Sequence, residues 1–146
     1  MKRKLFVAAV VSLLAIASFA GSARADERLY VSGPGGGLGA NYTVPALIIG
    51  QGDSVRYRNI DIAAHDVRST SLGPDRPWCT QFPFDFTPGR CPLFTSKLIG
   101  LAGESLVYGI DELVVPQGET VATYPFVCSI HGWMEGTLIV VNPALT

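Results

Sequence analysis

Charged residues are scarce in this sequence, and basic residues are scarcer than acidic ones. Lys, Arg, Asp and Glu make up 16% of the chain, and its formal net charge at pH 7 is −1, whereas about a quarter of an average globular protein is charged. A chain without a basic excess lacks the electrostatic footprint that nucleic acid or an anionic membrane surface requires. We therefore expect no nucleic acid and no membrane surface among its partners.

Long apolar runs are absent except at the N-terminus. There MKRK precedes LFVAAVVSLLAIASFA, and Ala23, Arg24 and Ala25 follow as a small-residue cleavage site. The apolar run has about 16 residues, too few to span a bilayer, and no Cys near residue 25 offers a lipid anchor. We predict that residues 1–25 are a signal peptide, removed on export, and that the mature protein is soluble and periplasmic or secreted. Four of the 11 basic residues lie in this segment, which leaves seven against 12 acidic residues and a net charge of −5.

Helical periodicity is also absent after residue 25. Short apolar segments rich in Val, Ile, Tyr and Thr alternate with Gly and Pro, which predicts an all-β fold. In SVRYRN, residues 54–59, apolar and charged side chains alternate as in a strand with one buried face. Residues 26–146 suit a single domain, a Greek-key β-sandwich or barrel of about eight strands. The expected strands are 29–31, 42–49, 54–59, 66–69, 94–98, 104–108, 122–128 and 136–141.

Cysteine is rare, with three in the chain, and export places them where disulfides persist. Cys79 and Cys91 bracket a Pro-rich aromatic stretch without an evident core, so we assign a disulfide to this pair. The bond would staple an insertion at residues 71–92, which we expect to form no regular element. This insertion would be a lid, a contact surface or a segment that merely packs on the sandwich. Cys128 remains as a free thiol, either reactive or an inert buried residue.

The stretch CSIHGWM places Cys128, His131 and Met134 three residues apart, ahead of the apolar run GTLIVV. A Cys beside a His is often a packing accident, and a lone Met is usually core filler. Their joint spacing in a turn between two strands can instead aim all three side chains at one point, and His65 is the one other His of the chain. Two His, a Cys and a weak axial Met are the donors of a blue-copper site. Zinc gains little from a thioether, and no Cys-x-x-Cys-His motif offers covalent haem attachment.

Three segments resemble the cupredoxins, the small blue copper proteins. They are GDSVRYRNIDIAAHDV, FTSKLIGLAGE and, above all, TYPFVCSIHGWMEGTLIVV. The two residues between His131 and Met134 are similar to the short ligand loop of amicyanin, whereas plastocyanin and pseudoazurin place four there. The chain thus looks amicyanin-like or plastocyanin-like, with a gap in the resemblance at the stapled insertion.

The resemblance implies one copper ion with His65, Cys128 and His131 as equatorial ligands and Met134 as the axial ligand. The family commonly has Asn after the first His and Pro before the second, whereas this chain has Asp66 and Ile130. We expect Asp66 to accept a hydrogen bond from the Ser129 hydroxyl. We also expect the backbone N–H groups of Asp66 and Ile130 to point at the Cys128 sulfur.

The implied function is transfer of single electrons between redox partners by a monomer that is not an enzyme. Partners would dock on an apolar patch near His131 and Trp133, although Trp133 is alternatively a buried plug beneath the loop. A different class of function is copper storage or delivery without electron transfer, which usually involves many Met and His. A third is a partner-binding sandwich that holds no metal.

Overall fold

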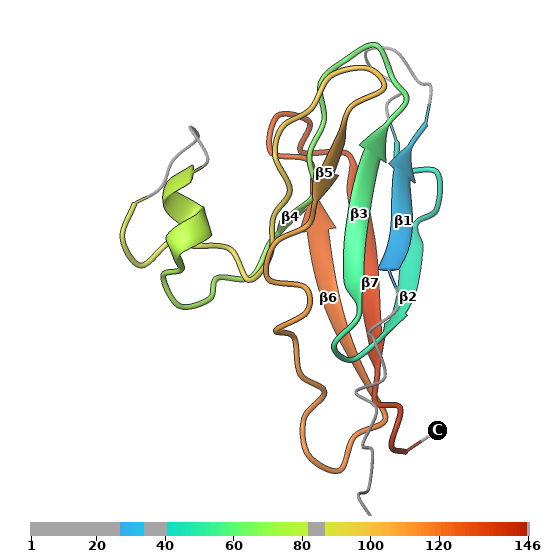
Figure 1. Ribbon diagram of the computed structural model, residues 1–146, viewed down its shortest axis with the longest axis vertical. Helices are drawn as coiled ribbons and strands as arrows, with labels where there is room; N and C mark the ends of the chain where they lie inside the picture. Colours follow the sequence, from blue (N-terminus) through green and yellow to red (C-terminus); the bar gives the residue numbers. More distant parts are fainter. Residues whose placement is uncertain (1–26, 34–40, 82–86, 146) are drawn as a thin grey trace, which may run out of the picture.

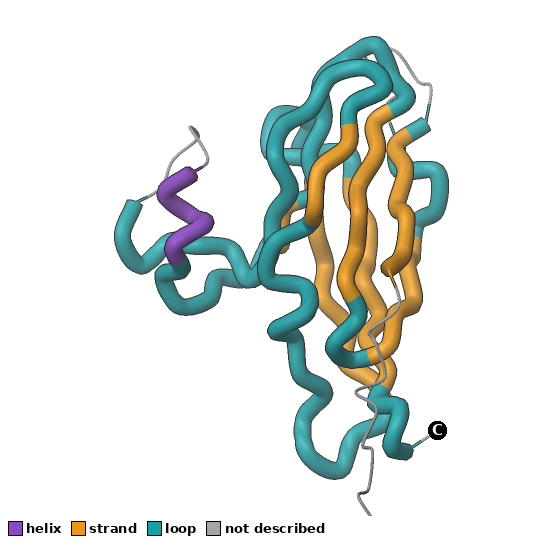
Figure 2. The backbone as a smooth tube through the Cα atoms, viewed as in Figure 1, coloured by secondary structure: helices purple, strands orange, loops and turns teal. Residues whose placement is uncertain are grey.

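Two β-sheets pack face to face in this computed structural model, which describes residues 27–33, 41–81 and 87–145. Figure 1 and Figure 2 show the two layers, with loops joining them at both ends. One sheet has the order β1 (Glu27–Ser32), β3 (Ser54–Asn59) and β5 (Glu104–Leu106). The other has the order β2 (Ala46–Gly50), β7 (Glu135–Val141), β6 (Val121–Val127) and β4 (Arg68–Ser69). The predicted all-β class is confirmed, while the predicted signal peptide lies outside the described residues.

The core lies between the sheets and follows the alternation expected of half-buried strands. In β3, Val55 and Tyr57 are buried whereas Arg56 and Arg58 are exposed. Strand β7 buries every second residue in the same way. Parallel pairing of β1 with β3 and of β2 with β7 brings segments far apart in the chain side by side. Antiparallel pairing of β6 with β7 then leaves their connecting turn at one end of the sandwich.

The structure describes seven strands, and the strand predicted at 94–98 is not among them. This segment makes isolated bridges instead, through Thr95 to Arg68 and Tyr108. Its bonds to Val67 mix side chain and backbone: Ser96 Oγ accepts the N–H of Val67 at 2.9 Å, and the N–H of Ser96 donates to Val67 O at 2.8 Å. The strand predicted from Tyr42 also begins later, at Ala46, because Pro45 has no N–H to donate to a ladder.

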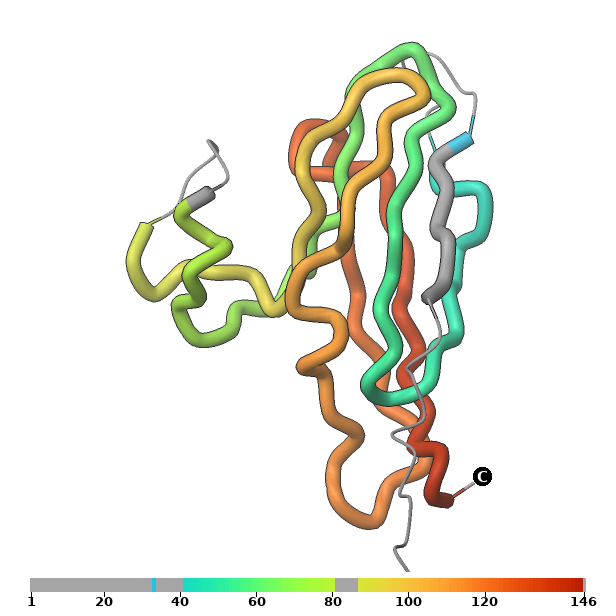
Figure 3. Tube along the Cα trace, in the orientation of Figure 1, coloured from blue at the N-terminus to red at the C-terminus, as the bar shows by residue number. Residues whose placement is uncertain are grey.

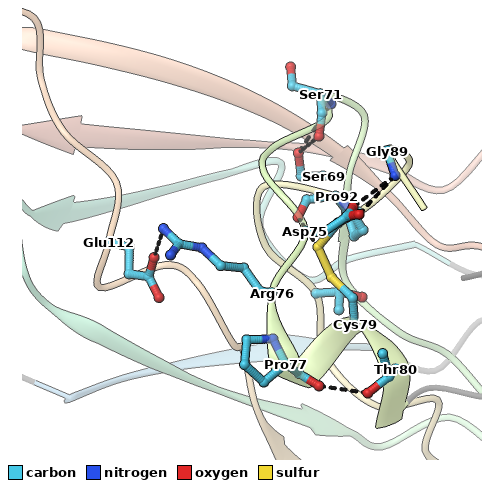
Figure 4. The surroundings of a disulfide bond; sticks show 12 residues. Ser69, Ser71, Asp75, Arg76, Pro77, Cys79, Thr80, Gly89, Pro92 and Glu112 are labelled. Carbon is cyan, nitrogen blue, oxygen red and sulfur yellow. Dashed lines mark hydrogen bonds and ion pairs between the residues drawn. A yellow bond between two sulfur atoms is a disulfide. The ribbon is translucent and has the colours of Figure 1, made fainter. Parts of the chain in front are cut away.

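The predicted disulfide between Cys79 and Cys91 is present, and both residues are buried. The segment that it staples projects from the sandwich beside β4 (Figure 1). Our expectation that residues 71–92 form no regular element is wrong, because Pro77–Gln81 form a 3-10 helix, η1. Figure 4 shows the Asp75 carboxylate accepting the N–H of Gly89 beside the disulfide. Together with the disulfide, these bonds give order to the described part of the insertion.

In the described part of the insertion, Arg76 and Trp78 contact the sandwich. Arg76 forms an ion pair with Glu112, drawn in Figure 4. The Trp78 ring stacks on Tyr108 with ring centroids 6.4 Å apart. The insertion is therefore packed on the loop that follows β5. Within the described part of the chain, no helix has the length and apolar character needed to cross a membrane.

Candidate metal centre

Three side chains from two distant segments meet at one end of the sandwich. The ligand atoms of His65, Cys128 and His131 all lie within 4.8 Å of one another. His65 Nδ1 is 3.0 Å from His131 Nδ1 and 3.8 Å from Cys128 Sγ, and His131 Nδ1 is 3.5 Å from the same sulfur. Figure 3 shows the two segments, the green β3–β4 connection and the orange-red β6–β7 turn, at the same end of the molecule. The predicted convergence of these three residues is confirmed.

The turn between β6 and β7 is built by its own backbone. The N–H of Cys128 donates to Met134 O at 3.0 Å, and the N–H of Met134 donates to His131 O at 2.8 Å. The N–H of His131 donates in turn to Cys128 O at 3.2 Å. These bonds close a tight loop whose spacing of three residues presents Cys128 and His131 to the same point.

His65 enters from the connection between β3 and β4. Two backbone hydrogen bonds, each 3.0 Å long, pair His65 with Ile99. The strand that we expected at 66–69 begins later, at Arg68, so this bridge and not a strand holds the backbone of His65. The His65 side chain is 0% exposed. The backbone N–H and C=O of His65 are both bonded to Ile99, and its imidazole is buried. The ring therefore has little freedom to move away from Cys128 and His131.

Asp66 joins the two segments that carry the ligands. Its carboxylate accepts the backbone N–H and the hydroxyl of Ser129, each at 2.6 Å. The Tyr42 hydroxyl donates to the Asp66 carbonyl at 2.6 Å. The predicted bond from the Ser129 hydroxyl is confirmed, and the bond from its backbone N–H doubles the connection.

The surroundings of Cys128 act on the pKa of its thiol in opposite directions, with a net rise. Burial raises the pKa of the Cys128 thiol, and the negative charge of Asp66 acts in the same direction. Backbone hydrogen bonds from Asp66, Ile130 and His131 act in the opposite direction. A raised pKa keeps the thiol protonated at neutral pH in the metal-free protein. A cation is then needed to favour the thiolate, and its binding releases a proton.

Met134 is fully buried next to this cluster along the chain. Its backbone is bonded to both Cys128 and His131. A buried Met is compatible with a thioether ligand and with ordinary core packing, and its role as the axial ligand stays a prediction.

Sequence reasoning missed Asp61, whose carboxylate Oδ2 lies 2.9 Å from His65 Nε2. Asp61 is 2% exposed, and a buried carboxylate beside an imidazole is a frequent companion of metal-binding histidines. Its spacing of four residues before His65 was the one available signal. In a loop, a spacing of four residues does not show that two side chains lie close together, because loops have no fixed periodicity.

The donor chemistry of the cluster fits copper. A thiolate and two imidazoles form the trigonal set of blue-copper sites, and a nearby thioether suits copper better than zinc. Within the described residues this is the one group of three or more His, Cys, Asp or Glu side chains placed to hold a metal ion. The site thus accommodates one type 1 copper ion.

Two exposed apolar side chains flank His131 in the turn between β6 and β7. His131 is half-buried, whereas the neighbouring Ile130 is exposed and Trp133 is 53% exposed. The Trp133 ring lies 5.2 Å from the His131 ring. Trp133 is therefore a surface residue beside His131, and the alternative of a buried plug is wrong.

No family model and no curated protein sequence matches the chain. Solved structures do match. Reduced auracyanin from the photosynthetic bacterium Roseiflexus castenholzii is 18% identical with a TM-score of 0.52, and the match covers 80% of this chain and 98% of auracyanin. A reduced Cu(I) form of an amicyanin variant is 18% identical with a TM-score of 0.47, covering 78% of this chain and 81% of that one. The match to auracyanin shows that the chain has the fold of the cupredoxins.

Proposed function

We propose that this protein is an exported type 1 copper protein that carries single electrons between redox partners. The observation that supports the proposal most strongly is the meeting of His65, Cys128 and His131 within 4.8 Å on a cupredoxin fold. We further propose that these three residues are the equatorial ligands of the copper and that Met134 is the axial ligand. Copper bound in this way would supply the one-electron change between Cu(II) and Cu(I).

The protein's contribution is to hold the ligands in nearly one arrangement in both oxidation states. His65 and Cys128 are each 0% exposed, so water has little access to the inner side of the site. The Asp66–Ser129 bonds tie the two ligand segments together. A site that is fixed from both sides rearranges little when the charge of the ion changes. Little rearrangement favours fast electron transfer.

Partners would reach the site through His131, because this residue is half-buried whereas the other three proposed ligands are fully buried. Ile130 and Trp133 are exposed beside it and offer apolar contact area. We propose that redox partner proteins dock on this patch and that the protein acts as a monomer. A small apolar contact suits a transient encounter, since weak redox complexes bury less surface than stable ones.

The proposed location is the periplasm or the extracellular space, reached by removal of residues 1–25. N-terminal sequencing of the exported protein tests this point. A mature chain that starts at Asp26 supports export with cleavage, and an intact Met1 contradicts it.

Visible absorption and voltammetry of the mature copper-loaded protein test the function. We expect the intense blue colour of a thiolate-to-Cu(II) transition and a reversible one-electron wave. Cys128→Ser should lose the colour, whereas Glu119→Gln, an exposed control, should keep it. Tight copper binding without colour or a reversible wave would instead favour storage or delivery. Absence of copper binding would overturn both functions.

A further inference from the structure

A buried carboxylate stands behind the innermost imidazole of the metal centre. Asp61 Oδ2 lies 2.9 Å from His65 Nε2, and the two side chains are 2% and 0% exposed. The other ring nitrogen, His65 Nδ1, faces Cys128 Sγ and His131 Nδ1. The two edges of the ring therefore have separate partners, an acid on one side and the ligand cluster on the other.

The nature of these partners selects one tautomer of His65. An ionised carboxylate can accept a hydrogen bond and cannot donate one, so the proton of the neutral ring is placed on Nε2. The Nδ1 lone pair is then directed at the cluster. This is the form that a histidine must have in order to bind a metal through Nδ1.

Asp61 is itself held in place. Its Oδ1 accepts the N–H of Ile62 at 2.7 Å, and its own N–H donates to Asn59 Oδ1 at 2.9 Å. The Asn59 amide donates to Ile99 O at 2.9 Å, and this carbonyl also accepts the backbone N–H of His65. The carboxylate and the imidazole are thus mounted on one backbone scaffold.

We infer that Asp61 is a positioning residue of the metal centre, which fixes His65 for binding and places a buried negative charge behind it. The inference rests on the proposed copper function and goes beyond it, because it assigns control of copper affinity and reduction potential to a residue that does not touch the ion. A negative charge close to the ion stabilises Cu(II) more than Cu(I), since the attraction grows with the charge of the ion.

Two variants separate orientation from charge. Asp61→Asn keeps an oxygen of similar position and removes the charge, whereas Asp61→Ala removes both. Loss of a partner of a ligating histidine typically lowers metal affinity by about 10–100-fold. A tenfold loss that fell on Cu(II) alone would raise the reduction potential by about 59 mV. We expect this order of increase in Asp61→Asn and a lower Cu(II) affinity in both variants.

Asp111→Asn is the matched control, because it removes the same charge from an exposed side chain. Copper affinity by competition titration and potential by voltammetry are measured for the wild type and all three variants. Asp111→Asn should match the wild type in both. An Asp61→Asn variant whose potential and Cu(II) affinity also match the wild type would overturn the inference.

A second readout needs no metal. Side-chain ¹⁵N shifts of the metal-free wild type should show His65 with its proton on Nε2, and Asp61→Ala should lose this preference. A wild-type ring with the proton on Nδ1 would overturn the inference even if Asp61→Ala failed to fold. If the wild type bound no copper, the proposed function would fail, and the tautomer measurement would still decide the role of Asp61 at His65.

Discussion

Replacement of Ile130 by Pro should lower the reduction potential of the copper centre. The backbone N–H of Ile130 acts to lower the pKa of the Cys128 thiol, as a donor to the sulfur does. A donor at this sulfur reduces the electron density that the thiolate gives to Cu(II), so the bond favours Cu(I). Proline has no N–H, and the substitution removes the donor.

The size of the shift follows from the strength of one hydrogen bond. A typical bond contributes about 1 kcal/mol net. A factor of ten in an equilibrium is about 1.4 kcal/mol and about 59 mV for one electron. If the whole bond energy distinguished the two oxidation states, the potential would fall by about 40 mV. The part of the bond energy that is common to both oxidation states does not contribute to this shift.

Ile130→Ala is the matched control, since it trims the exposed side chain and keeps the N–H. Voltammetry of both variants and the wild type gives the comparison. A Pro variant with the same potential as the Ala variant, or a higher one, would refute this account of the sulfur's hydrogen bonds. Absorption spectra should confirm that both variants keep the thiolate bound to Cu(II).

Three further changes have defined outcomes. Asp66→Ala should lower the free energy of unfolding of the metal-free protein by about 3 kcal/mol in urea titrations, because the Ser129 N–H and hydroxyl lose a charged acceptor. Gly136→Ala should lower it by about 1–3 kcal/mol, because the new Cβ would lie 2.4 Å from the Phe126 ring. The metal-free wild type should lose stability as the pH rises above about 8.5, the unfolded thiol's pKa, because burial raises the pKa of Cys128 in the folded state. Cys128→Ser should lose less stability over the same alkaline range.

For each of these three expectations, one result would contradict the physical reason given for it. Gly100→Ala adds a methyl group where no atom lies within 4 Å, so equal losses at Gly100 and Gly136 would argue against the steric explanation. Unchanged stability in Asp66→Ala would mean that the connection to Ser129 does not hold the ligand segments. Parallel alkaline curves for the wild type and Cys128→Ser would show that the Cys128 thiol does not contribute.

Local patterns in the sequence predicted the strands best. The alternation in SVRYRN gave β3 with the bounds Ser54–Asn59, and apolar runs located β6 and β7 to within one residue. The segment 94–98 has the composition of a strand, but it pairs with its neighbours through isolated bridges at Thr95 and not in a continuous ladder. Strand order and parallel pairing depend on contacts distant in the chain, and no local pattern encodes them.

The site was predictable to the extent that its residue types are rare. With two His in the chain and one free Cys, few metal ligand sets were available, and the structure brings those three together. Asp61 was not predictable, because Asp is common in loops and its position behind His65 depends on the fold of residues 59–65. The half-exposed position of Trp133 likewise required the shape of the turn.

The most direct test of the central claim is a crystal structure of the copper-loaded mature protein with anomalous scattering measured at the copper edge. The account predicts one copper peak bound by His65 Nδ1, Cys128 Sγ and His131 Nδ1, with Met134 Sδ at a longer distance. A copper peak that lies elsewhere, or that leaves the His65 imidazole out of its coordination, would contradict it.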